Sequence, residues 1–150
     1  MNTEKVTIDS NILCYAYRDE NLTKQERALE LLVEKKPYVS HFVLFEFLHQ
    51  LHKNSGNKKS NENYREHSKL PKKETIRLLI KLIEEGLRVM PISPDIYHKS
   101  NFLINRNDFQ LADSLIVADS VLNGCTVLYT EDMCTGMIID EKMKIVNPFL

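Results

Sequence analysis

Apolar residues form two kinds of pattern along this chain: short continuous runs and longer stretches with helical spacing. The short runs are rich in β-branched and aromatic side chains, which favours buried β-strands. They comprise Val6–Ile8, Tyr38–Val39, Leu87–Ile92, Thr126–Tyr129 and Lys144–Val146.

Between these runs, apolar residues recur every three or four positions, which predicts helices. Thr23 and Glu26 match a capping box at the start of a helix that runs to about Glu34. Ser40 is placed to cap the next helix, in which Phe47 faces inward. Three more helices are predicted: Ile76 to Ile83 before Gly86, one that opens at Pro94, and Leu111 to Leu122 before Gly124.

Strands that alternate with helices favour parallel strands joined by helical crossovers. We therefore predict an α/β fold: a three-layer sandwich with a central, mostly parallel sheet flanked by helices. A length of 150 residues suits one domain, spanning 1–150.

The composition is that of a soluble globular protein, with 43% hydrophobic and 27% charged residues. No run is long enough to span a membrane, and the first residues lead into a strand rather than a signal sequence. Cys14, Cys125 and Cys134 are odd in number and lack the spacing of a zinc site. We expect free thiols and a cytoplasmic protein.

The net charge of −1 is unevenly distributed. Residues 53–73 contain seven Lys or Arg and two Glu, whereas the rest of the chain contains 13 basic and 19 acidic residues. This basic segment is poor in apolar residues, which predicts a mobile loop. It is either a solvated insertion or an arm that attracts phosphate or docks a partner.

Four acids lie near predicted strand or helix ends: Asp9, Glu46, Asp113 and Asp132. Sites in open parallel sheets form at the carboxyl ends of strands, where the following helices also begin. The four carboxylates can therefore converge at one edge of the sheet. Their mutual repulsion would be removed by a hard divalent cation, which prefers oxygen ligands. Taken singly, each acid could instead be a turn former, a turn cap or a solvated residue.

The chain resembles PIN-domain ribonucleases, most closely the VapC-type toxins of bacterial toxin–antitoxin pairs. Four pieces, in the family's order, carry the resemblance: Ile8–Tyr15, Ser40–Leu48 with its Glu, Leu111–Ala118, and Leu128–Met133 followed by Gly136 and Ile145–Phe149. Three features depart from the family pattern: Ser114 and Asp119 where Ala is common, and the long basic segment. Asp119 is six residues past Asp113, about 240° round the helix, so it should not share the acid face.

The resemblance implies a metal-dependent endoribonuclease in which Asp9, Glu46, Asp113 and Asp132 hold Mg²⁺ or Mn²⁺. Asp9 and Asp113 are the expected direct ligands, and the other two acids act partly through water. The metal would activate a water molecule for attack on an RNA phosphodiester. Four neighbouring side chains are candidates for lesser roles: Ser10 and Thr130 in positioning a carboxylate or phosphate, Asn11 in steadying the loop after the first strand, and Glu131, an acid that could simply face solvent.

The resemblance also implies partners: an RNA substrate, a cognate antitoxin that blocks the acidic cleft, and a second copy in a homodimer. An acidic site needs positive charge nearby to hold RNA. We expect Lys53, Lys58, Lys59 and Arg65 to supply part of it.

Two other classes compete with the toxin interpretation. A phosphatase of the haloacid-dehalogenase type would carry a second Asp two residues after Asp9, where this chain has Asn11. A PIN-fold module that binds RNA or protein without catalysis is expected to lack at least one of the four acids, and none is missing. A PIN nuclease of RNA processing also remains open.

Overall fold

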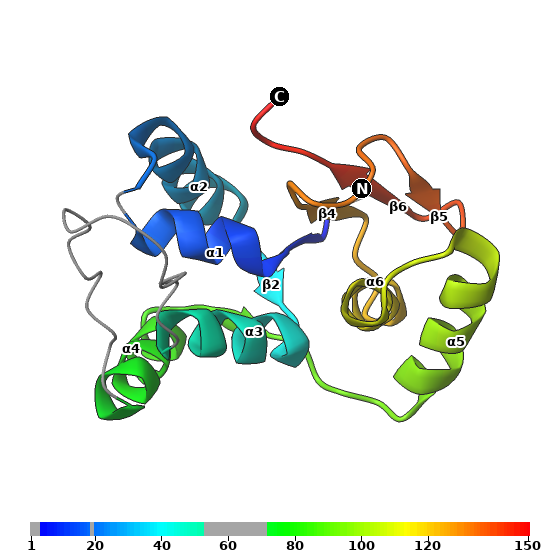
Figure 1. Cartoon of the computed structure of the whole chain (residues 1–150), viewed down its shortest axis with the longest axis horizontal. Coiled ribbons are helices and arrows are strands. Elements are labelled where there is room, and N and C mark those ends of the chain that lie inside the picture. Colours follow the sequence, from blue (N-terminus) through cyan, green and yellow to red (C-terminus); the bar gives the residue numbers. More distant parts are fainter. Residues whose placement is uncertain (1–3, 19, 53–71) are drawn as a thin grey trace, which may run out of the picture.

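The computed structural model describes residues 4–18, 20–52 and 72–150 (Figure 1). The predicted basic loop at 53–73 lies outside the described residues except for its last two, Lys72 and Lys73, which begin a helix.

All strands of the described chain join one sheet in the order β3-β2-β1-β4-β6-β5. Four neighbouring pairs run parallel, and only β5 and β6 are antiparallel. The strands are β1 (Val6–Ile8), β2 (Tyr38–Val39), β3 (Arg88–Val89), β4 (Val127–Tyr129), β5 (Ile138–Ile139) and β6 (Met143–Val146). In register, Ile8 at the end of β1 pairs with Tyr129 at the end of β4, so the residues after both strands emerge side by side.

Helices flank this sheet, as predicted for a three-layer α/β sandwich (Figure 1). They are α1 (Ser10–Tyr17), α2 (Leu22–Lys35), α3 (His41–His52), α4 (Lys72–Glu84), α5 (Asp95–Asn107) and α6 (Leu111–Leu122). Helix α1 packs against α2 and α3, and α6 packs against α5 and α3. Helix α3 therefore lies between α1 and α6, whereas α5, which follows β3, packs against α6. None of the described helices is both long and apolar enough to cross a membrane.

The central strands form the floor of the core. Ile8, Val39, Leu128 and Ile145 from four neighbouring strands are fully buried, and Phe47 of α3 packs into the same cluster. Burial on both faces is complete in β1, whose residues are all buried. In β6, by contrast, buried Met143 and Ile145 alternate with exposed Lys144.

The structure corrects four local predictions. The segment after Asp9, predicted as a loop around Asn11, is helix α1. Asn21, not Thr23, caps α2, since its side chain accepts a hydrogen bond from the Lys24 amide at 3.1 Å. The predicted strand 87–92 is reduced to β3, and β5 was not predicted.

Candidate functional site

Asp9 lies at the junction of β1 and α1. Its amide donates to the Tyr129 carbonyl at 2.9 Å, which extends the sheet by one residue, and its side chain caps α1. Its Oδ1 accepts from the Ser10 amide and its Oδ2 from the Thr130 hydroxyl, both at 2.7 Å. The residue is only 3% exposed, so these two donors fix a carboxylate that is almost out of water.

Thr130 and Asn11 connect Asp9 to the second acid of this sheet edge, Asp132. Buried Thr130 follows β4, and its Oγ1 accepts from the Asp132 amide at 3.2 Å while the hydroxyl donates to Asp9. The Asn11 side-chain amide donates to Asp132 Oδ2 at 3.0 Å. Thr130 and Asn11 therefore position two acids that lie 123 positions apart.

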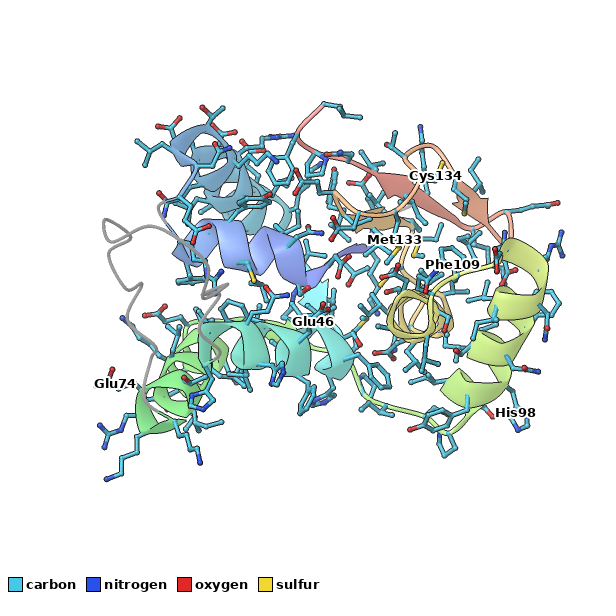
Figure 2. The ribbon with its side chains drawn as sticks, viewed as in Figure 1. Glu46, Glu74, His98, Phe109, Met133 and Cys134 are labelled. Carbon is cyan, nitrogen blue, oxygen red and sulfur yellow. The ribbon has the colours of Figure 1, made fainter. Side chains whose placement is uncertain are left out.

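The other two acids come from helices that start at the same edge. Asp113 is in the first turn of α6, and Glu46 is on the side of α3 that faces α1 and the sheet (Figure 2). Both are partly buried, whereas Asp132 is exposed. The site thus runs from buried Asp9 to a solvent-facing rim.

Electrostatics shows that the acids act on one another. Burial raises the pKa of Asp9 to about 6, although hydrogen bonds from Thr130 and Ser10 oppose the shift, and the charges of Glu46 and Asp113 raise it further. Burial also raises the pKa of Asp113, followed by the charges of Glu46 and Asp132. All four predicted residues are therefore electrostatically coupled, and the charged neighbours that act on the two aspartates are acids.

This donor set suits a hard divalent cation, because it consists of carboxylate oxygens whose repulsion a positive ion would offset. The described residues contain no group of three or more His, Cys, Asp or Glu arranged so that it could hold a metal ion. Mg²⁺ does not require such a group, since it keeps several waters and commonly binds one or two carboxylates together with substrate phosphates. The residues fit an ion held by few direct ligands rather than a closed cage.

Glu131 does not simply face solvent. Its carboxylate accepts from the Tyr15 hydroxyl at 2.5 Å and forms an ion pair with Lys24, whose ammonium also lies 3.2 Å from the Tyr15 oxygen. These contacts lower the pKa of Glu131. Sequence analysis missed both partners, because Tyr15 looked like part of an apolar motif and Lys24 like an ordinary helix residue.

Asp119 stays apart from the four acids, in agreement with its position on α6. It is fully buried, and the Asn123 side chain donates to its Oδ1 at 2.8 Å. Its Oδ2 has no hydrogen-bond partner within ordinary distance in the described part of the chain, although the Ser40 hydroxyl is near enough to lower its pKa. Burial is the larger influence and raises that pKa.

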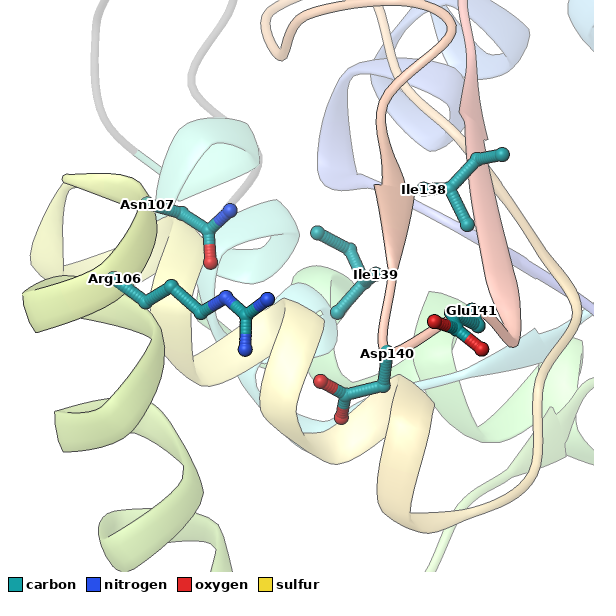
Figure 3. Close-up of a pocket in the computed structure, with 6 residues that line it drawn as sticks. All are labelled: Arg106, Asn107, Ile138, Ile139, Asp140 and Glu141. Carbon is teal, nitrogen blue, oxygen red and sulfur yellow. The ribbon is translucent and has the colours of Figure 1, made fainter.

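Two hollows of the described surface lie away from the acids. One, of about 460 Å³, lies between the end of α5 and the β5–β6 turn (Figure 3). It is lined by Arg106, Asn107, Ile138, Ile139, Asp140 and Glu141. A second, of about 610 Å³, lies over α2, the end of α4 and β3. Neither of these two hollows includes a predicted site residue. The candidate site is therefore assigned from the chemistry of the acids.

Comparison with known proteins identifies one family. The model of the PIN domain family matches residues 6–133. No curated protein matches the chain.

Solved structures with the same fold include toxin–antitoxin proteins. VapC20 of Mycobacterium tuberculosis, described as a sarcin-ricin loop cleaving toxin, has a TM-score of 0.61 at 15% identity, over 85% of this chain and 92% of that one. A toxin–antitoxin complex from Klebsiella pneumoniae has a TM-score of 0.62 at 18% identity, over 97% and 98%. VapBC-1 of nontypeable Haemophilus influenzae has a TM-score of 0.53 at 18% identity, over 85% and 86%. At these identities the likeness establishes a shared fold.

Proposed function

Since the chain belongs to the PIN domain family, we propose that it is a metal-dependent endoribonuclease and the toxin of a type II toxin–antitoxin pair. One observation carries the nuclease proposal: a nearly buried carboxylate, Asp9, lies among other acids that raise its pKa. A protein that only needed a stable fold would gain by replacing such a group. A bound divalent cation would turn the unfavourable cluster into a binding site.

Four acids are assigned to the ion. Asp9 and Asp113 are the proposed direct ligands, and Glu46 and Asp132 contact the ion directly or through water. A bound Mg²⁺ or Mn²⁺ supplies an activated water and offsets charge on the phosphate.

The remaining residues of the site orient the acids. Thr130 and the Ser10 amide hold the two oxygens of Asp9, which restricts the carboxylate to one orientation. The Asn11 side-chain amide donates to one oxygen of Asp132, Oδ2. Because Asp132 is exposed, the ion would be reached from solvent at that side, where an RNA phosphate can approach.

The substrate and partner assignments rest on weaker support. Solved toxins of the same fold include one described as cleaving the sarcin-ricin loop, and several were solved as complexes with an antitoxin. By that likeness we assign this chain an RNA substrate and a cognate antitoxin. The homodimeric state is proposed from the resemblance of the sequence to the VapC-type toxins. The cytoplasmic location is proposed from three cysteines without metal-site spacing. Lys53, Lys58, Lys59 and Arg65 are the proposed contacts to RNA phosphates.

The test of the nuclease is cleavage of total RNA by antitoxin-free protein with Mg²⁺ or Mn²⁺, with and without EDTA. Asp9→Asn is the test variant. Asp95→Asn, an exposed acid at the start of α5, is the matched control. Discrete fragments from the wild type and the control, absent with EDTA or Asp9→Asn, are expected. Absence of cleavage by folded protein would contradict the proposal and favour a binding module.

The test of the toxin assignment is growth of cells that express the chain. Arrest by the wild type and not by Asp9→Asn is expected, with relief when the cognate antitoxin is co-expressed. Metal-dependent cleavage without growth arrest would favour a PIN nuclease of RNA processing instead.

A further inference from the structure

The loop that carries Asp132 is tied to a cluster of side chains outside the acid site. The cluster comprises Glu131, Lys24 of α2, Tyr15 of α1 and Phe149 near the C-terminus. Both carboxylate oxygens of Glu131 are used: one pairs with Lys24, and the other accepts from the Tyr15 hydroxyl at 2.5 Å. Lys24 and Glu131 are 107 positions apart, so their pairing fixes this loop against a distant helix.

The pairing is partly shielded from water. The side chains of Lys24 and Glu131 are 29% and 24% exposed. The Lys24 ammonium lies 4.8 Å from the centre of the Tyr15 ring and 5.4 Å from that of Phe149, and these rings meet edge to face at 5.1 Å. An ammonium against two aromatic faces is held in place by more than its ion pair.

The cluster reaches the acid site through the backbone and Asn11. The Glu131 amide donates to Asn11 Oδ1 at 3.4 Å, while the Asn11 side-chain amide donates to Asp132 Oδ2 at 3.0 Å. Asn11 therefore contacts the backbone of Glu131 and the side chain of Asp132 at the same time. Asp132 itself is exposed. Its amide donates to buried Thr130, and its side chain accepts from Asn11.

We propose that Glu131, fixed by Lys24 and Tyr15, is a positioning residue that presents Asp132 to the divalent ion through Asn11. This inference rests on the proposed metal site and adds to it residues from α1, α2 and the C-terminal segment. Partners behind a ligand commonly change metal affinity by about 10- to 100-fold. Because this cluster acts one step further away, we expect about a tenfold effect.

The test is the affinity of the purified chain for Mn²⁺ alone, measured by calorimetry. Lys24→Met keeps the apolar stem and removes the charge, whereas Lys24→Arg keeps the charge. Glu131→Gln keeps the shape of the side chain and removes its charge. Lys35→Met removes another α2 ion pair, that with Glu4 at 3.3 Å, and serves as the matched control. Thermal unfolding of each variant shows that it is folded at the temperature of the measurement.

We expect the Mn²⁺ dissociation constant to rise about tenfold in Lys24→Met and in Glu131→Gln, and no further in the double variant, because the two residues act as one unit. Lys24→Arg should retain most of the wild-type affinity for Mn²⁺, and the affinity of Lys35→Met should match that of the wild type. Phe149→Ala, which loosens the cluster from its far side, should cause a smaller rise.

Two results separate this inference from the proposed function. Wild-type affinity in folded Lys24→Met and Glu131→Gln would overturn the positioning role and leave the metal site intact. Absence of Mn²⁺ binding by the wild type would overturn both. An equal loss in Lys35→Met would also overturn the positioning role, since the effect would then come from the charge of α2.

Discussion

Two regions of this molecule place acids close together, and they differ in what balances the charge. In the acid site, Asp9 at the end of β1 and Asp113 at the start of α6 have other acids as the charged neighbours that raise their pKa. At the β5–β6 turn, Asp140 forms an ion pair with Lys99 (Figure 3 shows Asp140 beside the pocket). The first region concentrates negative charge, and the second neutralises it within the protein.

The difference separates a site from a structural contact. A carboxylate that is buried among other acids reduces stability unless a ligand offsets the charge, whereas a paired carboxylate that keeps contact with water has little effect either way. The turn shows a second structural feature: Asp140 and Glu141 both have positive φ, 50° and 54°, in the region that Asn and Asp tolerate best among non-glycine residues. Acid content alone thus does not mark a site, and neither does burial alone, since Asp119 is buried apart from the four acids. A buried acid surrounded by other acids does mark one.

The largest contrast between the regions should appear in activity. Asp9→Asn should lower RNA cleavage by more than about 100-fold, because it removes a proposed direct ligand rather than a supporting partner. Asp140→Asn should leave cleavage within about twofold of the wild type. Initial rates on a defined RNA with Mg²⁺ measure both. Equal losses of cleavage rate in the two variants would contradict the distinction between the two regions.

The second contrast concerns stability without metal. The pKa of Asp9 is raised from 3.8 to about 6, so the folded state binds this proton more tightly than the unfolded state does. The resulting stability is present below pH 3.8 and is lost as pH rises through about 6. At 1.36 kcal/mol per pKa unit the loss is about 3 kcal/mol.

Denaturant unfolding in EDTA from pH 4 to 7 measures this effect as the difference between the wild type and Asp9→Asn. Asp140→Asn should follow the wild type. Mg²⁺ should recover part of the loss above pH 6 by binding the folded state. A wild type and Asp9→Asn that depend on pH in the same way would contradict the raised pKa.

A smaller effect should come from the hydroxyl that holds Asp9. Thr130→Val removes the donor to Asp9 Oδ2, so the pKa of Asp9 should rise further and cleavage should fall about tenfold, with its optimum at higher pH. Thr7→Val is the matched control, because Thr7 is buried in β1 and its hydroxyl has no hydrogen-bond partner among the described residues. The pH–rate profile measures the shift. Identical profiles for the two variants would contradict the proposal that the Thr130 hydroxyl holds Asp9.

The smallest effect should come from the compensated region. A double-mutant cycle of Lys99→Met and Asp140→Asn should give a coupling energy of about 0.5 kcal/mol that decreases with salt. The measurement is the free energy of unfolding at low and high ionic strength. A coupling of several kcal/mol would mean that this turn is not an ordinary surface contact.

The positions of the acids could be predicted from the sequence because they follow from topology. The carboxyl ends of parallel strands lie at the same edge of the sheet. Asp9 and Asp132 follow β1 and β4, which are neighbours. The same reasoning brought Asp113 and Glu46 to that edge from the starts of two helices.

What supports the acids could not be predicted, because it depends on contacts between distant segments. Glu131 looked like a solvent-facing acid until Lys24 and Tyr15 were placed against it by α2 and α1. Local competition explains the smaller errors. Asp9 begins α1 by capping it, which hid an eight-residue helix behind a loop-like motif, and Asn21 competes with Thr23 as a cap.

The most direct test of the central claim is a crystal structure of the chain with Mn²⁺, with the ion located by anomalous scattering. The account predicts a peak within coordination distance of Asp9 and Asp113, with Glu46 and Asp132 as direct or water-mediated ligands, and none at Asp140. An empty acid site at saturating Mn²⁺, or a peak only at the β5–β6 turn, would contradict it.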